Sequence, residues 1–295
     1  MKGLTTDEIM EIALELAGFS EIPQDSGIHV PGKNIKRIIL SMDVNVGVLH
    51  MAKQMDFDAV VGHHPCGVLL KQGEVYRRHI DLLEKHGIPR EKAMDALGES
   101  IDSTVRRTEN QRFRMMFFES PNQTVLEVDA AKILDLPFMN VHNPLDETGR
   151  GILQTKIDEV ASEVSDLKLR DILTLIEEMP EARYAKDQYG ISPRIFVGEP
   201  DSAASKVVFV HGAKTAPSPE IISFYWENGF KTIVVLHATF ETLEALRKGG
   251  RGNLICTGHF LGDSIGITPF IGRLREKGLE VVCMGGIIDI QNVPS

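Results

Sequence analysis

The 295-residue chain is poor in cysteine, has no long apolar run and has no excess of positive charge, and each shortage excludes a class of protein. Cys66, Cys256 and Cys283 are odd in number and widely spaced, which fits neither a disulfide framework nor a zinc knuckle. Cys66 lies two residues after His64 and is a possible metal ligand, but we interpret it as a small packed residue. We therefore expect a reduced, cytoplasmic protein.

Membrane, secreted and nucleic-acid-binding proteins are also disfavoured. No segment approaches the roughly 20 apolar residues that cross a bilayer, and the amino-terminal stretch turns acidic at Asp7 and Glu8 without a signal-peptide core. A formal net charge of −10 argues against a general nucleic-acid or anionic-membrane surface. With 42% hydrophobic and 25% charged residues, the composition is that of an ordinary globular protein with one large or two medium domains.

The first positive signal is a pair of histidines after a short apolar run. Residues 59–61 are apolar without an amphipathic period, which is typical of a buried strand in a parallel sheet, and His63 and His64 follow Gly62. Pro65 keeps the backbone extended at His64. Ligands of open α/β sheets bind beyond the carboxyl ends of strands, and neutral imidazole suits borderline divalent metals. The pair indicates a metal site, a proton shuttle or a hydrogen-bonded structural feature.

The flanking pattern alternates strands and helices. Residues 5–8 form a capping-box pattern before a helix, and residues 25–32 are predicted to be a loop. A strand at 38–42, a helix at 46–55 and the strand before His63 form a βαβ unit. Residues 74–136 are mostly helical. A strand at 137–141 leads through a polar stretch to a helix that includes residues 152–164.

The remaining third of the chain again alternates strand and helix. Two apolar runs flank residues 199–202, which predicts a hairpin over 194–210. Strands at 232–236 and 254–258 are each followed by a histidine, His237 and His259. We predict an α/β fold of two interleaved lobes with largely parallel sheets, built on one side by the first and last segments. The predicted domains are 1–180, with a helical insert at about 74–136, and 181–295, and the site is expected in the cleft between them.

Two further stretches carry ligand chemistry. His142 and Asp146 follow the strand at 137–141. His259 and Asp263 are four residues apart, so on a first helical turn they share one face and can grip one ion. The alternative is an aspartate favoured by the helix dipole beside a polar loop histidine. The arginines between residues 106 and 114 are interpreted as a solvated helix face, with phosphate binding as the minor alternative.

Three separated features, taken in order, resemble one family. They are Gly62-His63-His64-Pro65 preceded by Asp43 and the loop at 25–28, then residues 141–146 followed by Gly149 and Gly151, then Gly258-His259-Phe260 followed by Asp263. The ordered set resembles the NGG-interacting-factor-three-like family, toroidal dinuclear-metal proteins often labelled GTP cyclohydrolase I type 2 homologues. The likeness covers most of the chain.

The resemblance implies a pair of divalent transition metal ions, Zn, Fe or Mn, and a homohexameric ring. Its implied ligands are His63, His64, Asp146, His259 and Asp263. His142 is implied to lie near the ions, and His142 and His237 are the candidates for a general base. The family usually has Glu where this chain has Asp263, so the shorter side chain is expected to bind one ion or to bridge two. The segment at 74–136 is longer than in compact members.

The expected function is dinuclear-metal-dependent hydrolysis of a nucleotide-like or phosphorylated small molecule. Two ions a few ångströms apart polarise a substrate oxygen and activate water. The alternative is a non-catalytic regulatory or metal-handling protein, for which a closed coordination shell would be expected. Gly249, Gly250 and Gly252 follow a helix and are interpreted as its carboxyl-terminal turn, and the Walker spacing Gly-x4-Gly-Lys-Ser/Thr is absent, so no nucleotide-recognition motif supports the cyclohydrolase label.

Overall fold

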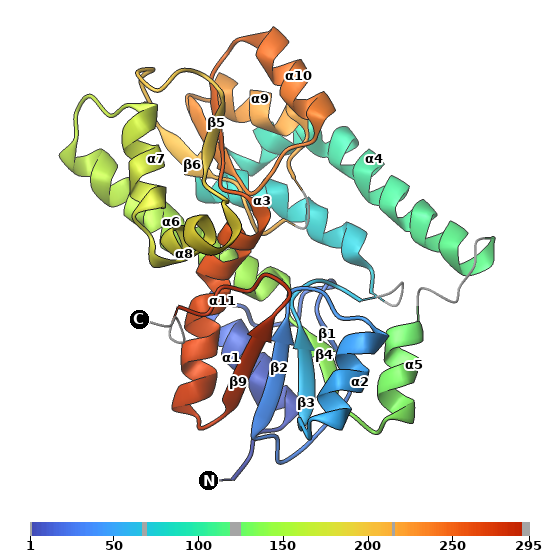
Figure 1. The fold of residues 1–295 in the computed structure, drawn as a ribbon. Helices are drawn as coiled ribbons and strands as arrows, with labels where there is room; N and C mark the ends of the chain where they lie inside the picture. The colour runs from blue at the N-terminus through green and yellow to red at the C-terminus, as the bar shows by residue number, and fades with distance from the viewer. Residues whose placement is uncertain (1, 67–69, 119–124, 214–215, 291–295) are drawn as a thin grey trace. The chain divides into compact units, whose positions relative to one another are not determined.

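A computed structural model describes residues 2–66, 70–118, 125–213 and 216–290, and these form two compact units, which are considered separately (Figure 1). The first unit combines Met1–Val75, Thr104–Thr148 and Ile267–Asp289. The second contains Tyr76–Ser103 and Gly149–Gly266. The predicted fold class of two interleaved α/β lobes is confirmed, because segments from near both ends of the chain build the first unit.

The first unit contains a five-stranded sheet in the order β1-β4-β3-β2-β9. Its strands are β1 (Gly27–Val30), β2 (Arg37–Ser41), β3 (Ala59–Gly62), β4 (Phe138–Asn140) and β9 (Glu280–Met284). Strands β4, β3, β2 and β9 are parallel, and β1 is an antiparallel edge strand beside β4. The loop predicted at 25–32 is therefore wrong in part. All four residues of β1 are half-buried, and a stretch of four residues is too short for its pattern to mark a strand.

Helices of the first unit follow their sequence signals closely. Helix α1 (Thr6–Ala17) begins with the predicted capping box between Thr5 and Glu8 and ends at Gly18, which has a left-handed backbone. Helix α2 (Val46–Gln54) packs against β3 and beside α5 (Leu126–Ile133), and α5 also contacts β1 (Figure 1). The contact is an apolar cluster that includes Leu49, Val60 and Phe138, and it fixes the strand ends from which the polar residues emerge.

The second unit contains a four-stranded sheet in the order β5-β8-β7-β6. Its strands are β5 (Arg194–Val197), β6 (Val207–Phe209), β7 (Thr232–Val235) and β8 (Asn253–Cys256), and only β5 is antiparallel to its neighbour. The predicted hairpin is wrong, because β5 and β6 lie at opposite edges. A turn does form, with Ser202 N–H donating to Glu199 O, but the chain after it pairs with Leu167 and Leu169.

Several helices surround these strands. They are the 3-10 helix η1 (Gln72–Arg77), which spans the unit boundary, α3 (Arg78–Lys85), the first part of α4 (Arg90–Phe117), α7 (Leu169–Glu177), α8 (Pro180–Tyr189), α9 (Pro219–Glu227) and α10 (Phe240–Gly249). Helix α8 begins at the boundary between the predicted domains 1–180 and 181–295. Its signals are local: Pro180 suits the first helical position, and Gly190 ends the helix in a left-handed conformation.

Two long helices, α6 (Asn143–Glu163) and α11 (His259–Glu276), each begin in one unit and end in the other. Helix α6 begins before the predicted stretch, so Asp146 lies in its first turn. Within the second unit the two helices approach closely, because a Cβ on Gly149 would lie 2.9 Å from the backbone nitrogen of Gly266. Among the described residues, no helix has the length and apolarity to cross a membrane.

Candidate metal centre

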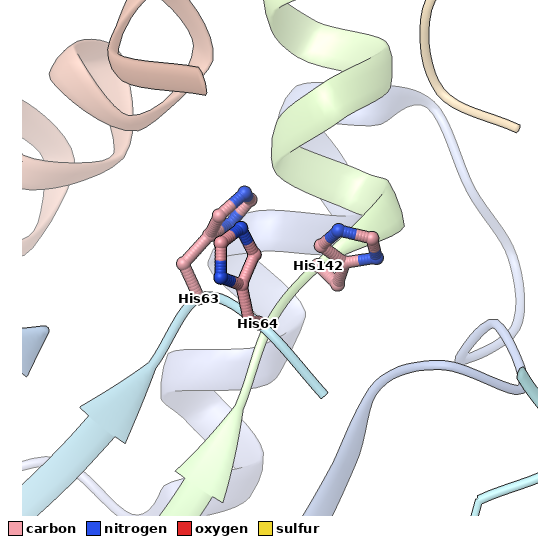
Figure 2. Close-up of side chains that lie close together, drawn as sticks. All are labelled: His63, His64 and His142. Atoms are coloured by element: carbon pink, nitrogen blue, oxygen red, sulfur yellow. The ribbon is translucent and has the colours of Figure 1, made fainter. Parts of the chain in front are cut away.

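The first unit brings three histidines together beyond the ends of β3 and β4 (Figure 2). Parallel pairing continues past β3, since the backbone N–H groups of His63 and His64 donate to Ser41 O and Met42 O, each at 2.9 Å. His63 is fully buried, and His64 is partly exposed. His142 follows β4 and immediately precedes α6.

Each of these imidazoles is held through its Nδ1 atom. Nδ1 of His63 lies 3.0 Å from the carbonyl oxygen of Val141. Nδ1 of His64 lies 2.8 Å from Asp43 Oδ1, and Nδ1 of His142 lies 2.7 Å from Asp25 Oδ2. Carbonyl and carboxylate oxygens only accept, so Nδ1 is the donor in each contact. In the neutral ring, Nε2 then carries the lone pair.

Asp146 lies beside two of these rings. Its Oδ1 is 3.3 Å from His63 Nε2, and its Oδ2 is 3.6 Å from His142 Nε2. One ring nitrogen from each of His63, His64 and His142 lies within 4.8 Å of the other two. His142 immediately precedes α6, and Asp146 follows four residues later in the first turn of that helix, so the two side chains share one face.

The electrostatics of this group favour a cation. His63 Nε2 and Asp146 Oδ1 are both acceptors when the imidazole is neutral, and both are buried. Two buried lone pairs at this separation are stabilised by a proton or a metal ion between them. Burial alone would lower the pKa of His142, but the carboxylates of Asp146 and Asp25 outweigh it and raise that pKa. The donor set of imidazoles and a carboxylate suits Zn, Fe or Mn, so it could hold such an ion.

Asp25 was quoted in the sequence motif but was not recognised as a site residue. It is fully buried, and its backbone oxygen accepts a hydrogen bond from Asn140 Nδ2 at 2.8 Å. The Asn140 side-chain oxygen in turn accepts from His29 Nε2 at 3.0 Å. Pairing of β1 with β4 creates this network, and an antiparallel edge strand gave no sequence signal that could have revealed it.

Cys66 packs in the apolar cluster beneath α2 and α5, in agreement with its interpretation as a packed residue. Burial, with a further contribution from Glu127, raises the pKa of its thiol to about 12. The metal-binding form of cysteine is the thiolate, so this environment disfavours ligation.

The second unit places a second polar group at the carboxyl ends of its parallel strands. His259 Nε2 lies 3.2 Å from Asp263 Oδ2 in the first turn of α11, as the four-residue spacing predicts. His211, which follows β6, has its Nε2 3.8 Å from Asp263 Oδ1. The ring of His237, which follows β7, lies 4.9 Å from that of His259.

Thus the predicted residues fall into two sets, one in each unit. His63, His64, His142 and Asp146 come together in the first unit. His237, His259 and Asp263 come together in the second, where Asp263 is almost fully buried. His211 was missed, although it carries the same signal as the others, a histidine directly after an apolar strand.

No protein-family model and no curated protein matches this chain. Among solved structures it is similar to a NIF3 superfamily protein from Sphaerobacter thermophilus, with 33% identity and a TM-score of 0.86 over 97% of this chain and 100% of that one. It is also similar to reduced HcgD from Methanocaldococcus jannaschii, with 14% identity and a TM-score of 0.55 over 96% and 97%. Protein SA1388 from Staphylococcus aureus shares 12% identity and a TM-score of 0.51 over 100% and 99%.

The last two likenesses concern the fold alone. The likeness to the Sphaerobacter protein extends over both chains at a third of identical residues, and the expected resemblance to proteins named for an NGG-interacting factor agrees with it. The chain belongs to the NIF3 superfamily.

Proposed function

We propose that the protein is a metal-dependent hydrolase acting on a phosphorylated or nucleotide-like small molecule. The proposed ligands of two divalent ions are His63, His64, Asp146, His259 and Asp263. The observation that carries the proposal is the acceptor-to-acceptor contact of His63 Nε2 with Asp146 Oδ1, with Nδ1 of His63 already engaged by Val141 O. A metal ion satisfies both atoms at once.

The proposal takes ligands from both units, and the helices that carry the two aspartates pack against each other in the second unit. Asp146 lies three residues before Gly149 on α6, and Asp263 lies three residues before Gly266 on α11. The backbones of Gly149 and Gly266 approach each other. One helical turn separates each aspartate from that approach.

The chemistry divides between the ions and the chain. Bound divalent ions supply Lewis acidity toward a substrate oxygen and lower the pKa of water. The residues of the chain hold the ligands in place: Asp43 and Asp25 fix the rings of His64 and His142 through Nδ1. His237, beside His259, is the proposed proton-accepting group, with His142 as the other candidate.

We also propose that the protein is cytoplasmic and forms a homohexamer, as its superfamily resemblance implies. Light scattering should then give about six times the 32.7 kDa mass of one chain. A monomeric mass at micromolar concentration would contradict the assembly without affecting the ligand set.

A second candidate function is non-catalytic metal binding. The observation in its favour is that the first unit gathers three imidazoles and one carboxylate, enough donors for a closed tetrahedral shell. A closed shell leaves no position for a substrate oxygen. Hydrolytic activity separates the two candidates.

The test is a screen of phosphatase and nucleotide-hydrolase substrates, including GTP, with protein reconstituted separately with Zn, Mn and Fe. The hydrolase proposal predicts turnover by the wild type that falls at least 100-fold in His63→Ala, because loss of a ligand disrupts the metal that the step requires. Metal binding without turnover of any substrate class would support the non-catalytic candidate instead.

A further inference from the structure

The ring of His142 is held in the same way as the rings of His63 and His64. In all three, Nδ1 donates to a carbonyl or carboxylate oxygen. Metal-ligating histidines in proteins nearly always have this arrangement, because the acceptor fixes the tautomer and the ring orientation and strengthens Nε2 as a ligand. His142 therefore lies in one group with the other two histidines and has the same kind of Nδ1 contact (Figure 2).

We infer that His142 is itself a metal ligand and that Asp25 is the residue that positions it. The imidazoles of His63, His64 and His142 and the carboxylate of Asp146 are then all ligands of the proposed ions. This inference rests on the proposed function, in which the same group binds metal, and it changes that proposal in one respect. A coordinated His142 does not serve as the general base, which leaves His237 in that role.

Asp25 is built into the fold as a partner for this ring. It is fully buried, and its Oδ2 lies 2.7 Å from His142 Nδ1. The residue after Asp25 also holds the backbone of His142, because the His142 N–H donates to Ser26 Oγ at 2.9 Å. A buried carboxylate is costly unless it is hydrogen-bonded, so its position has to be explained by the group it serves. Here that group is the imidazole whose Nε2 lies 3.6 Å from Asp146.

The contact with Asp25 determines which ring nitrogen of His142 carries the proton. An ionised Asp25 only accepts, so it requires the proton on Nδ1 of a neutral His142 and leaves the lone pair on Nε2. An asparagine at position 25 can donate its amide proton to Nδ1 instead, which moves the ring proton to Nε2. The ring would keep its place but would present a proton where the metal requires a lone pair.

The experiment measures zinc binding to metal-free protein by competition with a coloured chelator, and counts imidazole ligands by X-ray absorption. Asp25→Asn should weaken the tightest zinc site about 10- to 100-fold. His142→Ala should also remove one imidazole from the count. His29→Gln is the matched control, because His29 belongs to the same hydrogen-bond network through Asn140 but does not touch the group, and it should keep wild-type affinity and ligand count.

Folding is monitored by near-ultraviolet circular dichroism of the metal-free proteins. Where Asp25→Asn does not fold, His142→Gln, which retains polar hydrogen-bonding groups, takes its place. The imidazole count of His142→Ala separates the two roles, because a purely structural ring is not among the zinc ligands and its removal would not change the count. Wild-type affinity and imidazole count in His142→Ala overturn this inference alone. A wild type that binds no zinc overturns the proposed metal site as well.

Discussion

At the scale of single residues, the ligand atoms that the site can offer depend on which nitrogen of each histidine already makes a hydrogen bond. Asp43 and Asp25 occupy Nδ1 of His64 and His142, and the Val141 carbonyl occupies Nδ1 of His63. These contacts determine where lone pairs are placed, and therefore what the group can bind. Asp263 has the corresponding position in the second unit, with a histidine Nε2 near each of its carboxylate oxygens.

We predict that Asp263→Asn loses at least one of two ions and any hydrolytic activity, because a neutral amide cannot balance charge between cations. Asp263→Glu should keep two ions, since a longer side chain preserves the carboxylate that the family usually has at this position. Elemental analysis of both variants after identical reconstitution is the measurement. Wild-type metal content and activity in Asp263→Asn would show that Asp263 serves only as a helix amino-terminal residue.

A different histidine, His79, contributes to the pH dependence of stability. His79 in α3 is buried, its ring packs edge-on against Tyr76, and neither ring nitrogen has a hydrogen-bond partner among the described residues. Burial, assisted by the charge of Arg78, lowers its pKa from 6.5 to about 3. A lowered histidine pKa means that the unfolded state binds the proton first. Its contribution to stability is therefore complete above pH 6.5 and is lost as the pH falls toward 3.

We predict that His79→Leu flattens the acid side of the stability profile. Between pH 6.5 and 4, the wild type should lose up to about 1.4 kcal/mol more per pH unit than the variant, the slope of one proton. Urea denaturation at a series of pH values measures this difference. His50→Leu, at an exposed position of α2, is the control and should keep the wild-type slope. Parallel profiles for wild type and His79→Leu would contradict the account.

Some of the residues of the candidate site could be predicted from the sequence, and others could not. The histidines after strands, and the spacing of His259 and Asp263, could be predicted because strand ends and helical periodicity are local properties. The partnership of Asp25 with His142 could not, because it joins residues 117 positions apart through the pairing of β1 with β4, which no local pattern specifies. Tautomers follow from such distant acceptors and are invisible in a local pattern.

At the scale of elements, α6 and α11 carry Asp146 and Asp263 and pack closely in the second unit. The contact requires a residue without a side chain, since a Cβ on Gly149 would meet Gly266 N at 2.9 Å and Gly266 Cα at 3.2 Å. Backbone atoms cannot rotate away as a flexible side chain can. The close approach therefore constrains both helices just after their first turns.

We predict opposite effects for two alanine substitutions on α6. Gly149→Ala should destabilise the protein by about 1–3 kcal/mol through overpacking. Gly151→Ala, in the same helix but with open space around the added Cβ, should be neutral or stabilise it by roughly 0.5–1 kcal/mol through helix propensity. Thermal and urea denaturation measure both. Equal effects of the two substitutions would show that the helices do not make this contact.

Element prediction from sequence succeeded where the signal was self-contained. The capping box at Thr5 and the buried strand β3 are examples. It failed for the hairpin at 194–210, because a local turn at 199–202 does not determine which strand the following chain pairs with. It also started α6 too late, since the glycines at 149 and 151 resemble loop residues until the contact of Gly149 with α11 is known.

At the scale of the whole molecule, two compact units interleave along the chain, and each presents imidazole and carboxylate groups at the carboxyl ends of its parallel strands. Position at strand ends is the property that both sets share, and it is the usual location of ligand sites in open α/β sheets. The central claim is that these groups bind divalent transition metal ions.

The most direct test is the metal content of the wild-type protein purified without chelators, measured at pH 7.5 and again after dialysis at pH 5. Imidazole and carboxylate ligands bind metal only when deprotonated, so protons compete with the ions. The account predicts about two transition metal ions per chain at pH 7.5, lost at pH 5 and regained after reconstitution. A wild-type protein that retains no ion after incubation with Zn, Mn and Fe at pH 7.5 would contradict it.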